Sequence, residues 1–180
     1  IVGYGLTSLA LAKALVNKGI FTNKFFKKYN KKKDKSRSLG ISKSNIEFFN
    51  KNIQNIEKLL WDIKKIEIYS ENLNNEKIVD FKKNEQRLFS VIKNYELISS
   101  LTATLKKDKF CKFKKNSNDY ESIQKNYSLI INCEFNNKIT KKFFYKKLNK
   151  SYDSFAYTSV IEHQKLSKNN VATQNFTKEG

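Results

Sequence analysis

The pattern of apolar positions is clearest at the start of the chain. Ile1 and Val2 form an apolar strand end that runs into a glycine turn. After that turn, apolar side chains return at helical spacing, at Leu6, Leu9, Ala10, Leu11, Ala14 and Leu15. Gly19 follows the last of them, where the end of a helix favours a left-handed residue. Residues 1–19 therefore predict a strand, a tight turn and a helix, which is how a dinucleotide-binding βαβ unit opens.

The turn itself carries the candidate chemistry, in residues Gly3, Tyr4, Gly5, Leu6, Thr7 and Ser8. The first glycine allows the tight turn, and the second lets the backbone approach a pyrophosphate. The N–H groups and dipole of the helix N-terminus then hold the anion. Ser8 stands where the pattern has a third glycine, and serine is small enough for close packing there. We predict nucleotide binding at residues 3–8; the alternative is an ordinary buried helix after a glycine turn.

The rest of the chain alternates predicted strands and helices. Apolar runs predict strands at 20–26, 63–69, 78–81, 110–113, 127–133, 155–162 and 171–176. Helical spacing predicts helices after a Ser42 or Ser44 cap and from Asn94 onward. Residues 116–126 are predicted to be a loop, and 136–150 helix and loop. This pattern predicts an α/β fold with an inserted β-rich part.

Two pairings and one position in a sheet are expected for these strands. Strands 63–69 and 78–81 should form a hairpin outside the nucleotide-binding sheet. Residues 127–133, YSLIINC, are strongly apolar and should be central in a parallel sheet. Strands 155–162 and 171–176 should be antiparallel neighbours.

The charge raises the question of nucleic acid, since the formal net charge of the 180 residues is +19. The lysines are spread along the whole chain, however, and Arg37 and Arg87 are the only arginines. A nucleic-acid binder more often has arginines in a stripe with aromatic neighbours, so we expect no nucleic-acid partner. Weak attraction to an acidic membrane surface is the more plausible consequence of the charge.

The same composition bears on compartment and metals. No stretch is long and apolar enough to span a membrane and no signal peptide is visible, so we expect a cytoplasmic protein, at most peripheral at the inner membrane face. Cys111 and Cys133 are expected to be two buried, reduced thiols. His163 is the only histidine, which excludes a multi-histidine metal centre, and no metal site is expected.

Several further segments stand in the order of motifs from one known family. They are SRSLGIS at 36–42, Trp61-Asp62-Ile63, IKNYEL at 92–97, and the tail from Ser154, in which Glu162, His163, Ala172, Phe176 and Gly180 match. Together with residues 1–19, they resemble the flavin-dependent aromatic hydroxylases, and specifically their ubiquinone-biosynthesis branch. The resemblance implies a Rossmann-like FAD-binding domain with an inserted β-rich substrate domain, similar to p-hydroxybenzoate hydroxylase and truncated here at the C-terminus.

The resemblance also implies the site and its ligands. FAD would be bound by residues 3–8 together with Arg37 and Asn94, and NAD(P)H is the candidate electron donor. Residues 1–62 and 84–150 would form the FAD-binding domain, with 63–83 an excursion hairpin and 151–180 the start of the substrate domain. The implied activity is hydroxylation of a polyprenylated phenol, with association with a ubiquinone-biosynthesis complex as a further expectation. No catalytic residue is assigned.

Two departures from the family pattern keep a second function open. The motif expected after YSLIINC is replaced by residues 134–141, in which Glu134 stands in for an aspartate. The second strand also lacks the acid that binds a ribose, and the first acidic residue after it is Asp34. The alternative is therefore a diverged, redox-inactive flavoprotein homologue that serves as an accessory subunit of a biosynthetic complex.

Overall fold

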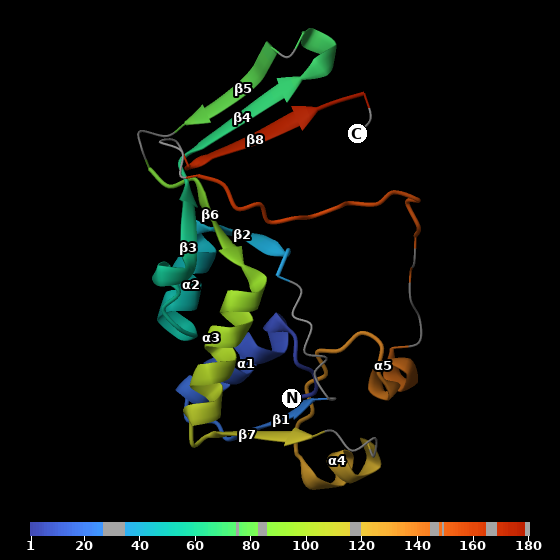
Figure 1. The fold of residues 1–180 in the computed structure, drawn as a ribbon. Helices are drawn as coiled ribbons and strands as arrows, with labels where there is room; N and C mark the ends of the chain where they lie inside the picture. The colour runs from blue at the N-terminus through green and yellow to red at the C-terminus, as the bar shows by residue number, and fades with distance from the viewer. Residues whose placement is uncertain are drawn as a thin grey trace.

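The computed structural model describes residues 1–26, 35–74, 76–82, 86–115, 120–144, 148, 150–164 and 169–178. The α-helices are α1 (Leu6–Asn17), α2 (Lys43–Asn52), α3 (Asn94–Lys107), α4 (Tyr120–Asn126) and α5 (Lys138–Phe143). The strands are β1 (Thr22–Phe26), β2 (Ser38–Ser42), β3 (Leu60–Ile63), β4 (Lys65–Ser70), β5 (Glu76–Lys82), β6 (Phe89–Lys93), β7 (Cys111–Lys115) and β8 (Val171–Phe176). This is a mixed α/β fold, which confirms the expected class (Figure 1).

A small parallel sheet carries the glycine turn. β1 pairs in parallel with β7, and Val2 forms parallel bridges to Phe25 on one side and Asn132 on the other. The N–H of Gly3 donates to the carbonyl of Phe25 over 2.8 Å, and the N–H of Cys133 donates to the carbonyl of Val2 over 2.9 Å. The order across the sheet is therefore β7, β1, the strand end at 1–3 and the segment around 132. Numbered by their order along the chain, these four segments lie in the order 3-2-1-4. In doubly wound sheets the same order occurs, and the strand order reverses between strands 1 and 4.

Helices cover both faces of this sheet. On one face, α1 and α3 lie side by side (Figure 1), and their apolar stripes meet through buried residues that include Leu9, Val16, Leu101 and Leu105. On the other face, Val2 and Phe25 pack with Ile123 of α4 and Ile139 of α5. Each of these helices thus buries apolar side chains against the sheet.

Two other sheets are built from the middle and end of the chain. β2, β6 and β3 form an antiparallel sheet in the order β2-β6-β3. β4 and β5 form an antiparallel hairpin, and β8 joins β4 in parallel. Figure 1 shows this third sheet at the opposite end of the molecule from β1 and β7. The predicted hairpin is therefore confirmed and lies outside the parallel sheet.

Other local predictions are confirmed as well. The second strand and the strand after Phe110 form as expected, and both helices begin as expected. The helix after Ser42 is shorter than its apolar spacing predicts: the spacing continues through Ile53 and Ile56, but α2 ends at Asn52. The backbone N–H of Asn45 donates to the Ser42 hydroxyl, so Ser42 is the cap of α2. Both thiols are free and Cys111 is buried as expected, but Cys133 is only half-buried, contrary to the prediction.

Three strand or loop predictions are wrong. Residues 155–162 are irregular and exposed, and β8 pairs with β4 in parallel instead of with them. A strand requires a neighbour to accept its backbone hydrogen bonds, and among the described residues none lies beside 155–162. Residues 120–126, predicted as loop, form α4, because Ile123 buries itself under the sheet. Residues 127–133 do lie parallel to the strand end at Val2, but only Asn132 forms a bridge, and within the described residues the segment lies at the edge of the sheet and not at its centre.

Candidate nucleotide-binding site

The two glycines of the turn have different tasks. Gly3 has a φ of +125°, which only glycine adopts readily, and a Cβ built on it would lie 3.0 Å from Cγ of Glu134. Gly5 has a φ of −70°, and a Cβ built on it would meet no atom within 4 Å. Gly3 is therefore required by the fold, whereas Gly5 leaves open space directly in front of α1.

The N-terminus of α1 faces that space. Gly5 is its N-cap, no side chain within the described residues caps it, and its first turn contains no acidic residue. The N–H groups of Leu6, Thr7 and Ser8 precede the first intrahelical bond, which Leu9 donates to Gly5. Uncapped N–H groups and the positive end of the helix dipole together favour an anion here.

Ser8 is not a simple substitute for the third glycine. It is fully buried, and its hydroxyl donates to the carbonyl of Gly5 over 2.8 Å. The same oxygen accepts a hydrogen bond of 2.7 Å from Nζ of Lys24 on β1. Lys24 also donates to the carbonyl of Gly3 over 2.7 Å and is itself fully buried. Hydrogen bonds from Lys24 therefore join β1 to α1 at the position where the third glycine of the pattern would let strand and helix pack closely without a side chain.

Burial sets the protonation of this lysine. Loss of hydration lowers the pKa of Lys24 to about 8, and nearby Cys133, Cys111 and Glu134 act in the opposite direction and offset only part of that change. Nothing in the glycine pattern predicts a lysine here. The signal in the sequence was a lysine directly before two phenylalanines in a predicted strand, together with the serine at the third-glycine position.

Tyr4 fixes the turn onto α3. Its hydroxyl donates to Oγ1 of Thr102 over 3.4 Å, and its ring lies 5.5 Å from that of Phe26, centroid to centroid. The ring of Tyr4 also lies 5.9 Å from Nζ of Lys24. The side chain at the middle of the turn is therefore used for packing, which leaves the backbone N–H groups as the ligand-facing part.

The structure brings the other two predicted residues together. The N–H of Asn94 donates to the carbonyl of Arg37 over 3.0 Å, next to the paired residues Ser38 and Lys93 of β2 and β6. Asn94 begins α3, the helix whose Thr102 meets Tyr4. The Arg37 side chain is exposed.

A polar network that the sequence analysis missed holds the loop beside the turn. The Asn132 amide donates to Oγ1 of Thr140 over 2.8 Å and accepts from the Asn137 amide over 2.7 Å. The Thr140 hydroxyl donates to the carbonyl of Glu134 over 2.6 Å. Because Asn132 bridges to Val2, this loop and the glycine turn share the carboxyl edge of neighbouring parallel strands. A crevice at that edge, where the strand order reverses, is where doubly wound sheets bind ligands.

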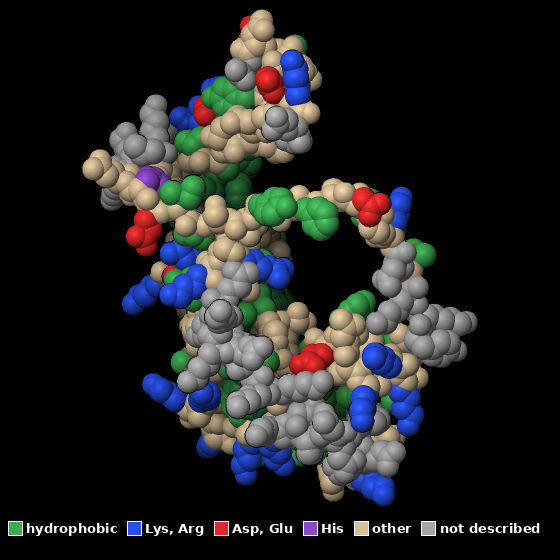
Figure 2. Space-filling model, turned by 45° about the vertical axis from the view of Figure 1, so that its right-hand side comes forward, with side chains coloured by type: hydrophobic (Ala, Val, Ile, Leu, Met, Phe, Trp, Pro, Cys, Tyr) green, Lys and Arg blue, Asp and Glu red, His purple; other side chains and the backbone are tan. Residues whose placement is uncertain are grey.

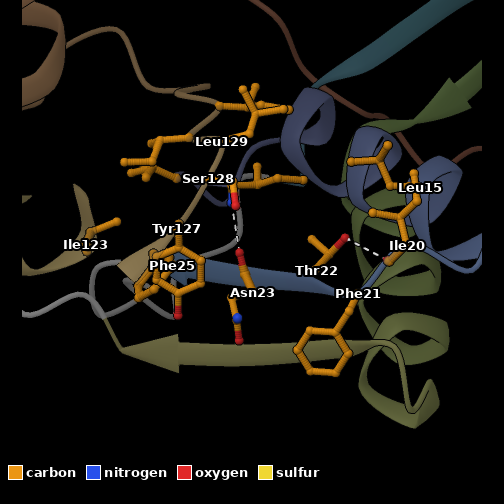
Figure 3. Close-up of a pocket in the computed structure, with 14 residues that line it drawn as sticks. Leu15, Ile20, Phe21, Thr22, Asn23, Phe25, Ile123, Tyr127, Ser128 and Leu129 are labelled. Carbon is orange, nitrogen blue, oxygen red and sulfur yellow. Dashed lines mark hydrogen bonds between the residues drawn. The ribbon is translucent and has the colours of Figure 1, made fainter. Parts of the chain in front are cut away.

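An apolar cavity lies at the opposite edge of the sheet. It has a volume of about 290 Å³ and lies between Ile20–Asn23 at the start of β1 and the segment of residues 127–131 (Figure 3). The ring of Phe25 meets that of Tyr127 edge-on across 5.5 Å. Because it opens at the amino ends of the strands, this cavity is separate from the glycine turn.

Three other residues noted in the sequence do not contribute to the turn in the part of the chain that the structure describes. Asp34 falls outside the described residues, and Glu162 and His163 are exposed in the irregular segment. No group of three potential metal ligands occurs in the part of the chain that the structure describes. Lysine and arginine side chains are scattered over the face shown in Figure 2. Nor does any described helix have the length and apolar character needed to cross a bilayer.

Solved structures share this fold. One is the p-nitrophenol 4-monooxygenase PnpA from Pseudomonas putida DLL-E4, with a TM-score of 0.53 and 13% identity over 64% of this chain and 30% of PnpA. A mutant of PqsL from P. aeruginosa has a TM-score of 0.52 and 11% identity over 63% of this chain and 32% of PqsL. FqzB has a TM-score of 0.51 and 18% identity over 63% of this chain and 27% of FqzB. The chain thus spans less than a third of the length of each. No family model matches the chain, and no curated protein matches it in sequence.

Proposed function

We propose that this chain is the nucleotide-binding part of an FAD-dependent monooxygenase acting on an aromatic substrate. One observation carries the proposal: an uncapped helix N-terminus follows a glycine turn at the switch point of a parallel sheet. The fold shared with a p-nitrophenol 4-monooxygenase supports the same reading. The finer substrate, a polyprenylated phenol of ubiquinone biosynthesis, rests on the resemblance of the motifs.

The residues fit a dinucleotide. The open space at Gly5 and the N–H groups of Leu6, Thr7 and Ser8 would hold the pyrophosphate. Arg37, exposed and not committed to the packing, would add a charged hydrogen bond to the nucleotide. Asn94, at the start of α3, would assist nucleotide binding by holding the main chain of Arg37 in place through its N–H. FAD, when bound, supplies the oxygen chemistry, and the protein's contribution is to bind it and to exclude water.

A second candidate is the redox-inactive accessory subunit. Its motivating observation is that Glu134 packs against Gly3 where the family has an aspartate-glycine motif. In the family that motif is associated with FAD and NAD(P)H function, so use of NAD(P)H is the activity most affected by the replacement. The two candidates differ in whether the full-length protein binds flavin and turns over.

The deciding experiment is a visible absorption spectrum of the full-length protein, followed by titration with FAD. Oxidised-flavin bands that co-elute with the protein support the monooxygenase. Gly5→Asp should abolish them, because the carboxylate would occupy the anion site. Gly5→Ala is the matched neutral variant: its Cβ enters the same space without a charge, so it should weaken FAD binding less than Gly5→Asp does. A colourless protein that ignores added FAD would favour the accessory subunit, and bound FAD without NAD(P)H oxidation would favour a flavoprotein that has lost its redox activity.

A further inference from the structure

Lys24 is the feature of the turn that the proposed function leaves without a task. Its side chain is fully buried, in a strand whose next residues, Phe25 and Phe26, are apolar. A buried lysine is costly because its charge loses hydration, and an apolar side chain would pack at least as well. Packing alone therefore does not account for a lysine at this position.

Its two acceptors bracket the anion-binding backbone. Gly3 ends the first strand, and Ser8 lies in the first turn of α1. Ser8 in turn holds the carbonyl of Gly5. The ammonium is thus fixed between strand and helix, behind the N–H groups that face the open space.

We propose that Lys24 is a positioning residue of the pyrophosphate site: its ammonium holds residues 3–8 in their anion-binding shape and places a fixed positive charge behind them. The ligand class is the pyrophosphate of a dinucleotide, so the inference rests on the proposed function. The residue acts through the turn and not by direct contact with the ligand.

Charge and anchoring can be separated, because a neutral amine still has two N–H donors for Gly3 and Ser8. Burial lowers the pKa of Lys24 to about 8, so the charge is lost within an accessible pH range. The other titratable groups that face it are the Tyr4 phenol, the carboxylate of Glu134 and the thiols of Cys111 and Cys133. Burial raises the pKa of both thiols above their usual range.

Two opposite pH trends follow. A bound anion raises the pKa of Lys24, so its contribution to affinity is present below about pH 8 and is lost as the pH rises. Without ligand, the folded pKa lies below the usual 10.5, so the free energy of unfolding increases as the pH rises from about 8 toward 10.5. A lysine with a merely structural task would show the second trend without the first.

The test is the dissociation constant of FAD for the full-length protein, measured by flavin fluorescence at several values between about pH 7 and about pH 9.5. For the unaltered protein we expect affinity to fall about tenfold for each unit by which the anion raises the lysine pKa. Lys24→Arg keeps the charge and should give tight, pH-independent binding. Lys24→Met should bind weakly at every pH, and Lys18→Met, at the exposed end of α1, should behave like the unaltered protein.

The outcomes separate the two proposals. A pH-independent affinity in the unaltered protein, or a pH dependence that survives in Lys24→Met, overturns the inference about Lys24 while leaving FAD binding intact. No FAD binding at any pH overturns the proposed function and, with it, the inference. If circular dichroism shows that Lys24→Met does not fold, the pH dependence of the FAD dissociation constant in the unaltered protein and in Lys24→Arg decides between the outcomes.

Discussion

The backbone N–H of Asn94 donates a 3.0 Å hydrogen bond to the carbonyl of Arg37. This bond joins the start of β2 to the start of α3, and α3 continues to Thr102, which accepts from Tyr4 in the glycine turn. Residues from three distant parts of the sequence are thereby tied to one helix. The main chain at Arg37 is fixed, while its exposed side chain remains available for a ligand.

Arg37→Ala should weaken FAD binding without affecting stability. A lost charge-assisted hydrogen bond of about 1.5–3 kcal/mol corresponds to about ten- to hundredfold in affinity. The midpoint of thermal unfolding should stay unchanged, because the Arg37 side chain is exposed and its carbonyl bond to Asn94 remains. Titration calorimetry and a thermal melt of the same preparations measure both quantities.

Arg87→Ala is the matched control. Arg87 is the other arginine and pairs with Glu57 over 3.0 Å and with Asp62 over 2.9 Å. Its removal should leave FAD affinity unchanged and lower stability slightly. Equal losses of affinity in both variants would mean that Arg37 acts only through general charge.

Gly3→Ala and Gly5→Ala should differ sharply in stability. At Gly3, alanine meets both a positive φ and Cγ of Glu134 at 3.0 Å, so we expect a loss of about 1–3 kcal/mol. At Gly5 the φ is ordinary and the space is open, so the loss should be about 0.5 kcal/mol, the difference between glycine and alanine at an N-cap. Urea unfolding of the two variants measures both values, and similar losses would contradict the distinct tasks assigned to the glycines.

Local sequence signals predicted the glycine turn and its helix well. These signals are the two glycines of the turn, the helical spacing of apolar residues and the glycine after the last of them, and each acts over only a few residues. As they predict, α1 begins at Leu6. The Ser42 cap and the β4–β5 hairpin were predictable for the same reason. The failures depend on distant segments: α4 forms where Ile123 packs under the sheet, and strands form only where a partner lies beside them. Whether 155–162 is a strand depends on a neighbour, which its own residues do not specify.

The site shows the same division. Residues 3–8 were predicted from their spacing, and Arg37 and Asn94 from resemblance, and these assignments stay predictions; neither approach pointed to Lys24, whose role is proposed from the structure alone. Its significance depends on β1 placing it under Ser8, which is a tertiary relationship. The Asn132 network was not predicted for a similar reason. Asparagine and threonine are common in surface loops, and only the folded structure brings the side chains of Asn132, Asn137 and Thr140 together.

Asn132→Ala should destabilise the loop beside the turn. It removes the donor to Thr140 and the acceptors for the Asn137 amide and the Glu134 N–H, so a loss of about 1–3 kcal/mol is expected from unsatisfied polar groups. Hydrogen exchange should show faster exchange at Thr140, whose N–H bonds to Asn137. The exposed Asn136→Ala serves as the control and should change neither quantity. Unaltered exchange at Thr140 in Asn132→Ala would show that the backbone alone holds this loop.

Acid should weaken the β4–β5 hairpin through Glu67. Lys65 and Lys77 lie 2.7 and 2.9 Å from its carboxylate, and their hydrogen bonds lower its pKa to about 2. Because the folded pKa lies below the usual 4.5, the contribution to stability is fully present above that pH and is lost as the pH falls toward 2. These two ion pairs lie at the surface and are partly exposed, so the effect should also shrink with added salt. Glu67→Gln should remove this part of the acid dependence, measured from hairpin amide signals by NMR, and an identical acid profile in that variant would assign the dependence to other carboxylates.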